Sequence, residues 1–187
     1  MTTEPTRTIQ WSWQPEVNDY LEAFHARNRA RGAWLKIGVI ALLGAVFAIA
    51  AFALGHPGPA MIGVEAAVLL PVLVPLLTWA STRALWKRRP ALHSLTRAAV
   101  SLAGITTDGP LVDMSNGQFA TGAVPGNLAL DAVAQVLETK RVFVVQLVGQ
   151  RGKRFLLLAK RGLVGPAELD ALRTILATAG ARPDASG

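Results

Sequence analysis

The sequence contains no cysteine, and charged side chains are scarce along its 187 residues. The lack of cysteine excludes disulfides and thiolate metal sites. Charged residues make up 17% of the chain, against about 25% in an average soluble domain. Half of the chain, 51%, is hydrophobic, and 19 basic residues against 12 acidic ones give a formal net charge of +7. This balance is more typical of a membrane protein than of a soluble enzyme.

Charge is missing altogether from one long run, residues 37–54, which reads IGVIALLGAVFAIAAFAL. A second apolar run follows at residues 60–80. A helix of eighteen residues rises about 27 Å, close to the roughly 30 Å hydrocarbon core of a bilayer. The two runs therefore predict a transmembrane helical hairpin. Because a mostly polar segment precedes the first run, we expect that run to remain as an anchor and not to be removed as a signal peptide.

Basic residues flank this pair of runs, whereas the loop between them, GHPGP at residues 55–59, has neither lysine nor arginine. Loops rich in lysine and arginine are retained in the cytoplasm. We therefore expect both termini to be cytoplasmic in a multi-pass protein of the cell (inner) membrane, with residues 81–97 as a basic juxtamembrane linker. The flanking residues are Arg27, Arg29, Arg31 and Lys36 before the first run, and Arg83, Lys87, Arg88, Arg89 and Arg97 after the second.

Three tryptophans, Trp34, Trp79 and Trp86, lie near the predicted cytoplasmic ends of the spans. Indole rings favour the headgroup layer of a membrane. Buried cores use tryptophan as well, so a core position is the alternative for each of the three.

Glu65 is the unusual residue of the second run, because an intramembrane carboxylate is by default a hypothesis of function. It lies five residues from the outer end of the predicted span, which favours a position near the headgroups or a contact between helices. Transport through the second span, with Pro71 and Pro75 favouring a kink, is the alternative. Small residues at Gly38, Ala41, Ala45 and Ala48 could allow close packing against the second span or against a neighbouring subunit.

The N-terminal segment, residues 1–36, contains a predicted strand followed by an amphipathic helix. In TIQWSW, residues 8–13, apolar and polar side chains alternate strictly, which predicts a half-buried strand. A helix is predicted from Pro15, with Val17, Tyr20, Leu21 and Phe24 on one apolar stripe. A lone strand has no partner, so we expect this one to pair with a sheet formed by the C-terminal region.

The C-terminal region, residues 98–180, predicts a small antiparallel β domain closed by a helix. Turn residues separate the apolar segments at intervals of about ten residues. A helix is predicted from Pro166, with Leu169, Leu172, Ile175 and Leu176 facing the core, and residues 181–187 are expected to be a flexible tail. The fold class is therefore a membrane α+β protein. The predicted strands are residues 99–106, 111–114, 118–124, 133–139, 142–148 and 154–159.

This layout resembles the YcxB-like bacterial membrane proteins over nearly the whole chain. The most specific likeness lies around residues 137–177, in the segments VLETKRVFVVQL, FLLLAKRGL and PAELDALRTIL. The resemblance implies a pleckstrin-homology-type fold for the C-terminal domain. It implies no established activity.

Seven basic residues fall within 22 positions of the predicted β domain, with no acid between the first and the last. Near a leaflet of anionic lipid, each exposed lysine or arginine can contribute about 1 kcal/mol to membrane attraction. A solvated basic face without a ligand is the alternative. These candidate lipid- or partner-binding residues are Lys140, Arg141, Arg151, Lys153, Arg154, Lys160 and Arg161.

Catalytic and metal-binding patterns do not stand out in the sequence. His25, His56 and His93 lie in separate elements without metal-ligand spacing, and GQRGKR lacks the frame of a phosphate-binding loop. We therefore expect no enzyme, no cofactor and no metal. Nucleic-acid binding is not expected either, because few aromatic residues accompany the basic strands. The sequence favours a membrane-anchored interaction module that binds a partner protein, anionic lipid or both, and it is compatible with a homo-oligomer. A small transport or pore subunit is the alternative.

Overall fold

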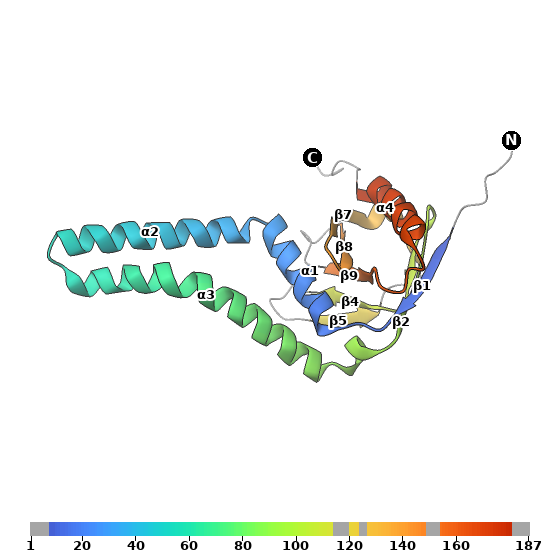
Figure 1. The fold of residues 1–187 in the computed structure, drawn as a ribbon, viewed down its shortest axis with the longest axis horizontal. Coiled ribbons are helices and arrows are strands. Elements are labelled where there is room, and N and C mark those ends of the chain that lie inside the picture. The colour runs from blue at the N-terminus through green and yellow to red at the C-terminus, as the bar shows by residue number, and fades with distance from the viewer. Residues whose placement is uncertain (1–7, 114–119, 124–126, 149–153, 181–187) are drawn as a thin grey trace. The chain divides into compact units, whose positions relative to one another are not determined.

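The computed structural model describes residues 8–113, 120–123, 127–148 and 154–180 (Figure 1). It contains two compact units. The hairpin unit comprises Phe24–Ala84, and the β unit comprises Met1–Ala23 together with Leu85–Gly187. The predicted tail at 181–187 and the predicted turns at Asn116-Gly117, Pro125-Gly126 and Gly149–Gly152 lie outside the described residues.

The hairpin unit is built from two long helices, α2 (Ala33–Ala53) and α3 (Pro57–Arg88). A shorter helix, α1 (Val17–Ala30), precedes them. The turns that lead into and out of α2 contain Gly32 and Gly55, whose positive φ angles of 64° and 76° suit glycine. The helix α3 runs on without interruption past Pro71 and Pro75. It also continues to Arg88, through much of the segment expected to be a linker.

Small residues allow α2 and α3 to approach closely. A Cβ atom added to Gly63 would lie 2.5 Å from the carbonyl oxygen of Gly44 and 2.9 Å from the Cβ of Ala48. No side chain larger than hydrogen fits there. Ala48 was among the small residues predicted for this contact, whereas Gly38 has nothing within 4 Å of its would-be Cβ. The contact is therefore centred on Gly44, Ala48 and Gly63.

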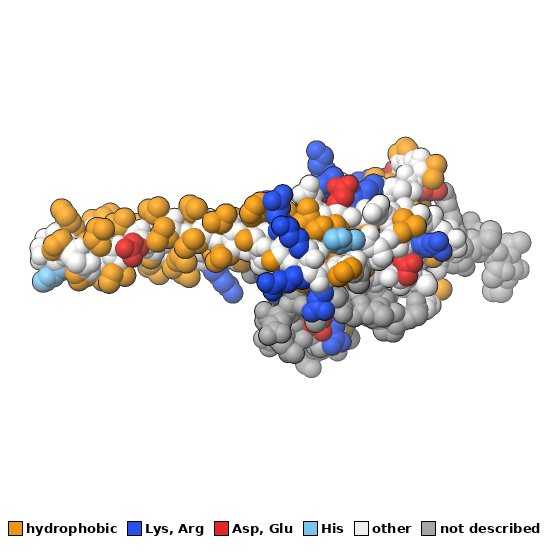
Figure 2. Space-filling model, turned by 90° about the horizontal axis from the view of Figure 1, so that it is seen from below, with side chains coloured by type: hydrophobic (Ala, Val, Ile, Leu, Met, Phe, Trp, Pro, Cys, Tyr) orange, Lys and Arg blue, Asp and Glu red, His pale blue; other side chains and the backbone are white. Residues whose placement is uncertain are grey.

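Away from this contact, most large side chains of both helices are hydrophobic and exposed, and Figure 2 shows one face of them. In the most apolar window of each helix, only 11% of the residues are buried. A core helix of a soluble domain would be mostly buried. The low buried fraction therefore distinguishes α2 and α3 from core helices. Both helices are long and apolar enough to cross a membrane.

In the β unit, the first sheet has the strand order β1-β2-β3-β6 and is antiparallel throughout. Its strands are β1 (Ile9–Trp13), β2 (Thr96–Ser101), β3 (Gly104–Thr107) and β6 (Asn127–Leu128). Ile9, Trp11 and Trp13 are buried and the residues between them are exposed, as the alternating pattern predicts. The N-terminal strand pairs along its whole length with β2. Its predicted pairing with the C-terminal region is therefore confirmed.

The second sheet has the antiparallel order β5-β4-β9-β8-β7. Consecutive residues are buried along β8 and β9, so both faces of these two strands are covered. The C-terminal helix α4 (Pro166–Gly180) packs against β7 of this sheet and β2 of the other. It buries Leu172, Ile175 and Leu176 of the predicted stripe. The strand bounds are β4 (Pro110–Asp113), β5 (Ala120–Ala123), β7 (Val133–Glu138), β8 (Val142–Leu147) and β9 (Arg154–Ala159).

One predicted strand, residues 99–106, is wrong. The chain reverses between Ser101 and Gly104, and the two halves pair with each other as β2 and β3. Gly104 has a φ of 151°, and a Cβ there would lie 2.5 Å from Oδ1 of Asn127 and 2.6 Å from the carbonyl oxygen of Leu128. The turn is built on this glycine and on packing against β6. It lacks the Asn-Gly or Pro-Gly pair that would have marked it.

Candidate functional site

A cluster of acidic and arginine side chains joins the start of α1 to the ends of β8 and β9. We call it the arginine cluster and define it as Glu16, Asp19, Arg141 and Arg161. The guanidinium of Arg161 pairs with the carboxylates of Glu16 and Asp19. Arg141 adds a contact of 2.9 Å from Nη2 to Oε2 of Glu16, and its Nε lies 4.0 Å from Oδ1 of Asp19.

Asp19 is the buried centre of the arginine cluster, since only 2% of its surface is exposed. It lies in the first turn of α1, where its Oδ2 accepts a hydrogen bond of 2.8 Å from the backbone N–H of Glu16. A carboxylate at that end of a helix interacts favourably with the helix dipole. The hydrogen bond from Arg161 lowers the pKa of Glu16 below its ordinary value, with smaller contributions from Arg141.

The backbone around the arginine cluster is equally constrained. The N–H of Arg141 donates a hydrogen bond of 3.0 Å to Oε2 of Glu22. Trp11 donates from Nε1 to the carbonyl oxygen of Ala159 at 2.8 Å. Gly162, with φ of 97°, passes so close to β1 that a Cβ would collide with the carbonyl oxygen of Ser12. The segment after β9 is thus fixed against both β1 and α1. Arg141 and Arg161 therefore have a structural role.

Other cations of the predicted basic face are paired as well. Arg154 contacts Asp113 at 2.6 Å, and Lys160 contacts Glu138 at 2.5 Å while lying 4.9 Å from the centre of the Phe143 ring. Lys140 is exposed in the turn between β7 and β8. Arg151 and Lys153 lie outside the described residues.

Glu138 holds a second cation, Arg173 of α4, with Nη2 at 2.7 Å from Oε1. Hydrogen bonding from Arg173, followed by that from Lys160, lowers the pKa of Glu138. Four of the five described residues of the basic face therefore make ion pairs with acids from other parts of the chain. The sequence could not reveal this, because no acid lies between Lys140 and Arg161.

The residues flanking the spans divide into two groups. In the hairpin unit, Trp34 and Trp79 are 37% and 43% exposed, and the guanidinium of Arg83 lies 4.4 Å from the Trp79 ring centre. In the β unit, the Trp86 ring lies 4.2 Å from that of His93 and 5.8 Å from that of Tyr20. Trp86 thus corresponds to the packing alternative, whereas exposure of the other two suits a headgroup position. Lys87, Arg88 and Arg89 are exposed.

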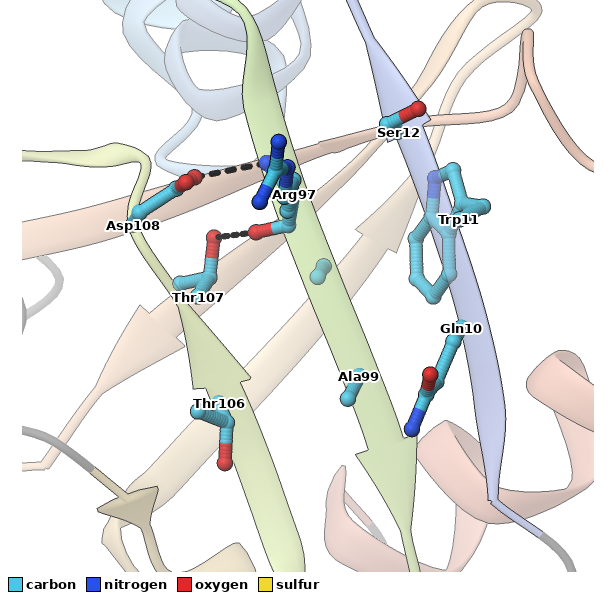
Figure 3. A pocket seen from close by; sticks show the side chains of 9 residues that line it. Gln10, Trp11, Ser12, Arg97, Ala99, Thr106, Thr107 and Asp108 are labelled. Carbon is cyan, nitrogen blue, oxygen red and sulfur yellow. Dashed lines mark hydrogen bonds between the residues drawn. The ribbon is translucent and has the colours of Figure 1, made fainter.

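An open groove of about 510 Å³ lies across β1, β2 and β3 (Figure 3). A cross-strand row explains it: Gln10 is opposite Ala99, which is opposite Thr106. Because the central residue is an alanine between two longer side chains, the surface is hollow there. Ser12 and Arg97 form the next outward-facing pair, and the backbone N–H of Arg97 donates to Oδ1 of Asp108 at 2.6 Å. The groove offers mainly neutral polar groups, together with the guanidinium of Arg97 and the carboxylate of Asp108.

The structure places Glu65 on α3. Its helix begins at Pro57, eight residues before it, so at 1.5 Å per residue it lies about 12 Å from that end. A Cβ on Gly44 would lie 3.3 Å from both Ala66 Cβ and Ala67 N, and 2.9 Å from the carbonyl oxygen of Gly63. Glu65 is therefore level with Gly44, near the middle of α2. It is exposed, and among the described residues it makes no hydrogen bond or ion pair.

No known protein-family model matches this chain, and no match was found among curated proteins or solved structures. The resemblance to YcxB-like proteins thus rests on the sequence segments alone. Any functional conclusion must come from the arrangement of this chain's own residues.

Proposed function

We propose that this chain is an integral membrane protein that crosses the bilayer twice and holds its β unit at the cytoplasmic face as an interaction module. The hydrophobic outward surface of α2 and α3 carries this proposal. In water, two helices with Leu42, Ile49 and Phe52 exposed by 65%, 72% and 74% would leave a large apolar area uncovered. In lipid, the same area is solvated by acyl chains, and every backbone group within the helices is satisfied internally.

The distribution of charge supports the orientation. Arg83 and the arginines of α1 lie at one end of the hairpin, and the turn between α2 and α3 contains no lysine or arginine. Exposed Trp34 and Trp79 lie towards the same basic end, where indole rings favour the headgroup layer. Both termini are accordingly placed in the cytoplasm in this proposal.

The β unit is proposed to be of the pleckstrin-homology type, as the resemblance to YcxB-like proteins implies. Two antiparallel sheets and a C-terminal helix that contacts a strand of each support this. A protein partner is favoured over anionic lipid. The reason is that Arg141, Arg154, Lys160 and Arg161 already have carboxylate partners, which offset much of their attraction for a negative surface.

Membrane insertion and orientation can be tested on the full chain. The protein should remain in the membrane pellet after alkaline carbonate extraction. Because the native chain has no cysteine, Gly58→Cys in the first turn of α3, at the proposed outer end, and Leu102→Cys in the β2–β3 turn provide single labelling sites. A membrane-impermeant maleimide added to intact cells should label only the first. Release by carbonate would disprove insertion, and labelling of Leu102→Cys from outside would disprove the orientation.

The choice between a protein partner and lipid can be tested by hydrogen exchange. Full-length protein would be reconstituted into vesicles of neutral lipid and into vesicles that also contain anionic lipid. We expect the same exchange rates at residues 138–142 and 159–162 in both. Protection of these residues in anionic vesicles alone would instead support headgroup contact.

A further inference from the structure

Glu65 occupies the centre of the α3 face that points away from α2. Successive residues of a helix are rotated by about 100°, so Gly63 and Ala67, which face α2, lie about 160° away from Glu65. The residues on the same face as Glu65 are apolar and exposed. They include Met61, Leu69 and Val72, with 60%, 47% and 61% of their surface accessible.

This position is unfavourable for a carboxyl group in an isolated hairpin. If the hairpin spans the bilayer, as proposed above, the level of Gly44 is close to the bilayer centre, where a polar side chain without a partner is costly. The described spans contain no basic side chain at that depth, since Glu65 is the one ionisable residue between His56 and Arg83 and the one charged residue of α2, Lys36, lies eight residues before Gly44. A partner for Glu65 must therefore come from outside its own hairpin.

We propose that the Glu65 face of α3 is the contact surface for a second copy of this chain, with the two Glu65 carboxyl groups hydrogen-bonded to each other. This inference rests on the proposed membrane insertion. A twofold axis along the membrane normal brings each residue to its own counterpart at the same depth. A protonated carboxyl both donates and accepts a hydrogen bond, so two of them are self-complementary. The apolar residues Met61, Leu69 and Val72 pack around this pair.

The absence of cysteine makes the contact testable by disulfide crosslinking in the full-length protein. Met61→Cys and Val72→Cys place single thiols on the proposed contact face. Ile49→Cys provides the control, because it is 72% exposed but lies on α2, about 100° around the helix from Ala48 and about 140° from Gly44. Each variant would be purified, reconstituted into phosphatidylcholine vesicles and oxidised, with the dimer fraction measured over a range of protein-to-lipid ratios.

We expect dimers from Met61→Cys and Val72→Cys and few from Ile49→Cys. Adding Glu65→Leu should weaken dimerisation about tenfold, the size expected when both hydrogen bonds of the carboxyl pair are lost in the membrane. Glu65→Gln should retain it, because an amide also donates and accepts.

Equal crosslinking at all three positions, or dimers that persist with Glu65→Leu, would overturn the proposal. Crosslinking in native membranes to a different protein only would assign the face to that other protein. Carbonate extraction of the same samples tests membrane insertion separately from the contact between two copies. A protein released by carbonate refutes insertion and this contact together, whereas an embedded protein without dimers refutes the contact alone.

Discussion

Individual residues determine the closest contacts in each unit: a glycine in the hairpin unit and a buried aspartate in the β unit. Gly63 sets the distance between α2 and α3, and Asp19 sets the position of Arg161 next to α1. For single residues, the sequence indicated which residue types matter but not which residues they contact. It marked small residues in the first span and Glu65 in the second, yet Asp19 and Arg161 are 142 positions apart and belong to different elements. No local pattern links two such residues.

Replacing Gly63 by leucine should separate the two helices. The new side chain would meet the backbone of Gly44 and the Cβ of Ala48, and overpacking of this kind costs about 1–3 kcal/mol. Spin labels at Ile49→Cys and Val68→Cys in detergent-solubilised protein should report a longer interhelical distance. Gly38→Leu is the matched control, because its added side chain meets nothing within 4 Å and should leave the distance unchanged.

Replacing Asp19 by asparagine should destabilise the β unit substantially. The substitution preserves the shape of the side chain but removes a buried negative charge from beside Arg161, and breaking a buried pair costs about 3–5 kcal/mol. Arg154→Gln, which removes a partly exposed ion pair with Asp113, should cost about 1 kcal/mol or less. Thermal unfolding of both variants compares the two losses. Equal shifts would show that the arginine cluster contributes no more than a surface pair.

Glu138 should make the stability of the β unit depend on pH in the acid range. Its pKa is lowered in the folded state by hydrogen bonding from Arg173 and Lys160. Its contribution is therefore present above the ordinary glutamate pKa of about 4.3 and is lost as the pH falls through the lower folded value. The difference in unfolding temperature between the native protein and Glu138→Gln should be largest above about pH 5 and should shrink towards pH 3.

At the scale of elements, periodicity predicted most of the fold. The alternation in residues 8–13 and the two apolar runs identified β1, α2 and α3, because burial on one face and a long uncharged helix each leave a plain pattern. The hairpin of β2 and β3 was missed because its turn contains none of the usual turn pairs and relies on Gly104 packing against β6. The length of α3 was also underestimated, since its last turns are basic and amphipathic and not uniformly apolar.

Deleting residues 1–14 should destabilise the first sheet. The deletion removes β1, which pairs with β2 from Ile9 to Trp13, and the hydrogen bond from Trp11 to Ala159. Hydrogen exchange in residues 96–107 should accelerate strongly in the full-length background, whereas deletion of residues 1–7, which precede β1, should have little effect. Unchanged exchange in the longer deletion would mean that β2 and β3 do not depend on the N-terminal strand.

At the scale of the whole molecule, the β unit is assembled from chain segments on both sides of the hairpin unit. The basic residues that the sequence grouped into one face are the part of the site that could least be predicted. Their pairing depends on Glu16 and Asp19 at the start of α1, Asp113 in β4 and Glu138 in β7, which the fold brings in from three separate segments. Net charge and spacing along the chain can be read from the sequence. The electrostatic potential at a surface depends in addition on which opposite charges the fold places beside the basic residues.

The pairing of β1 with β2 also constrains how the protein is made. The two strands are separated by residues 14–95, which include both candidate spans. At a synthesis rate of about 5–20 residues per second, β1 leaves the ribosome roughly 4–16 s before β2 exists. During that interval its tryptophan-bearing face has no sheet to join. The first sheet can therefore be completed only after the whole hairpin unit has been synthesised, so a stall within that unit would leave an unfinished sheet exposed to chaperones and proteases.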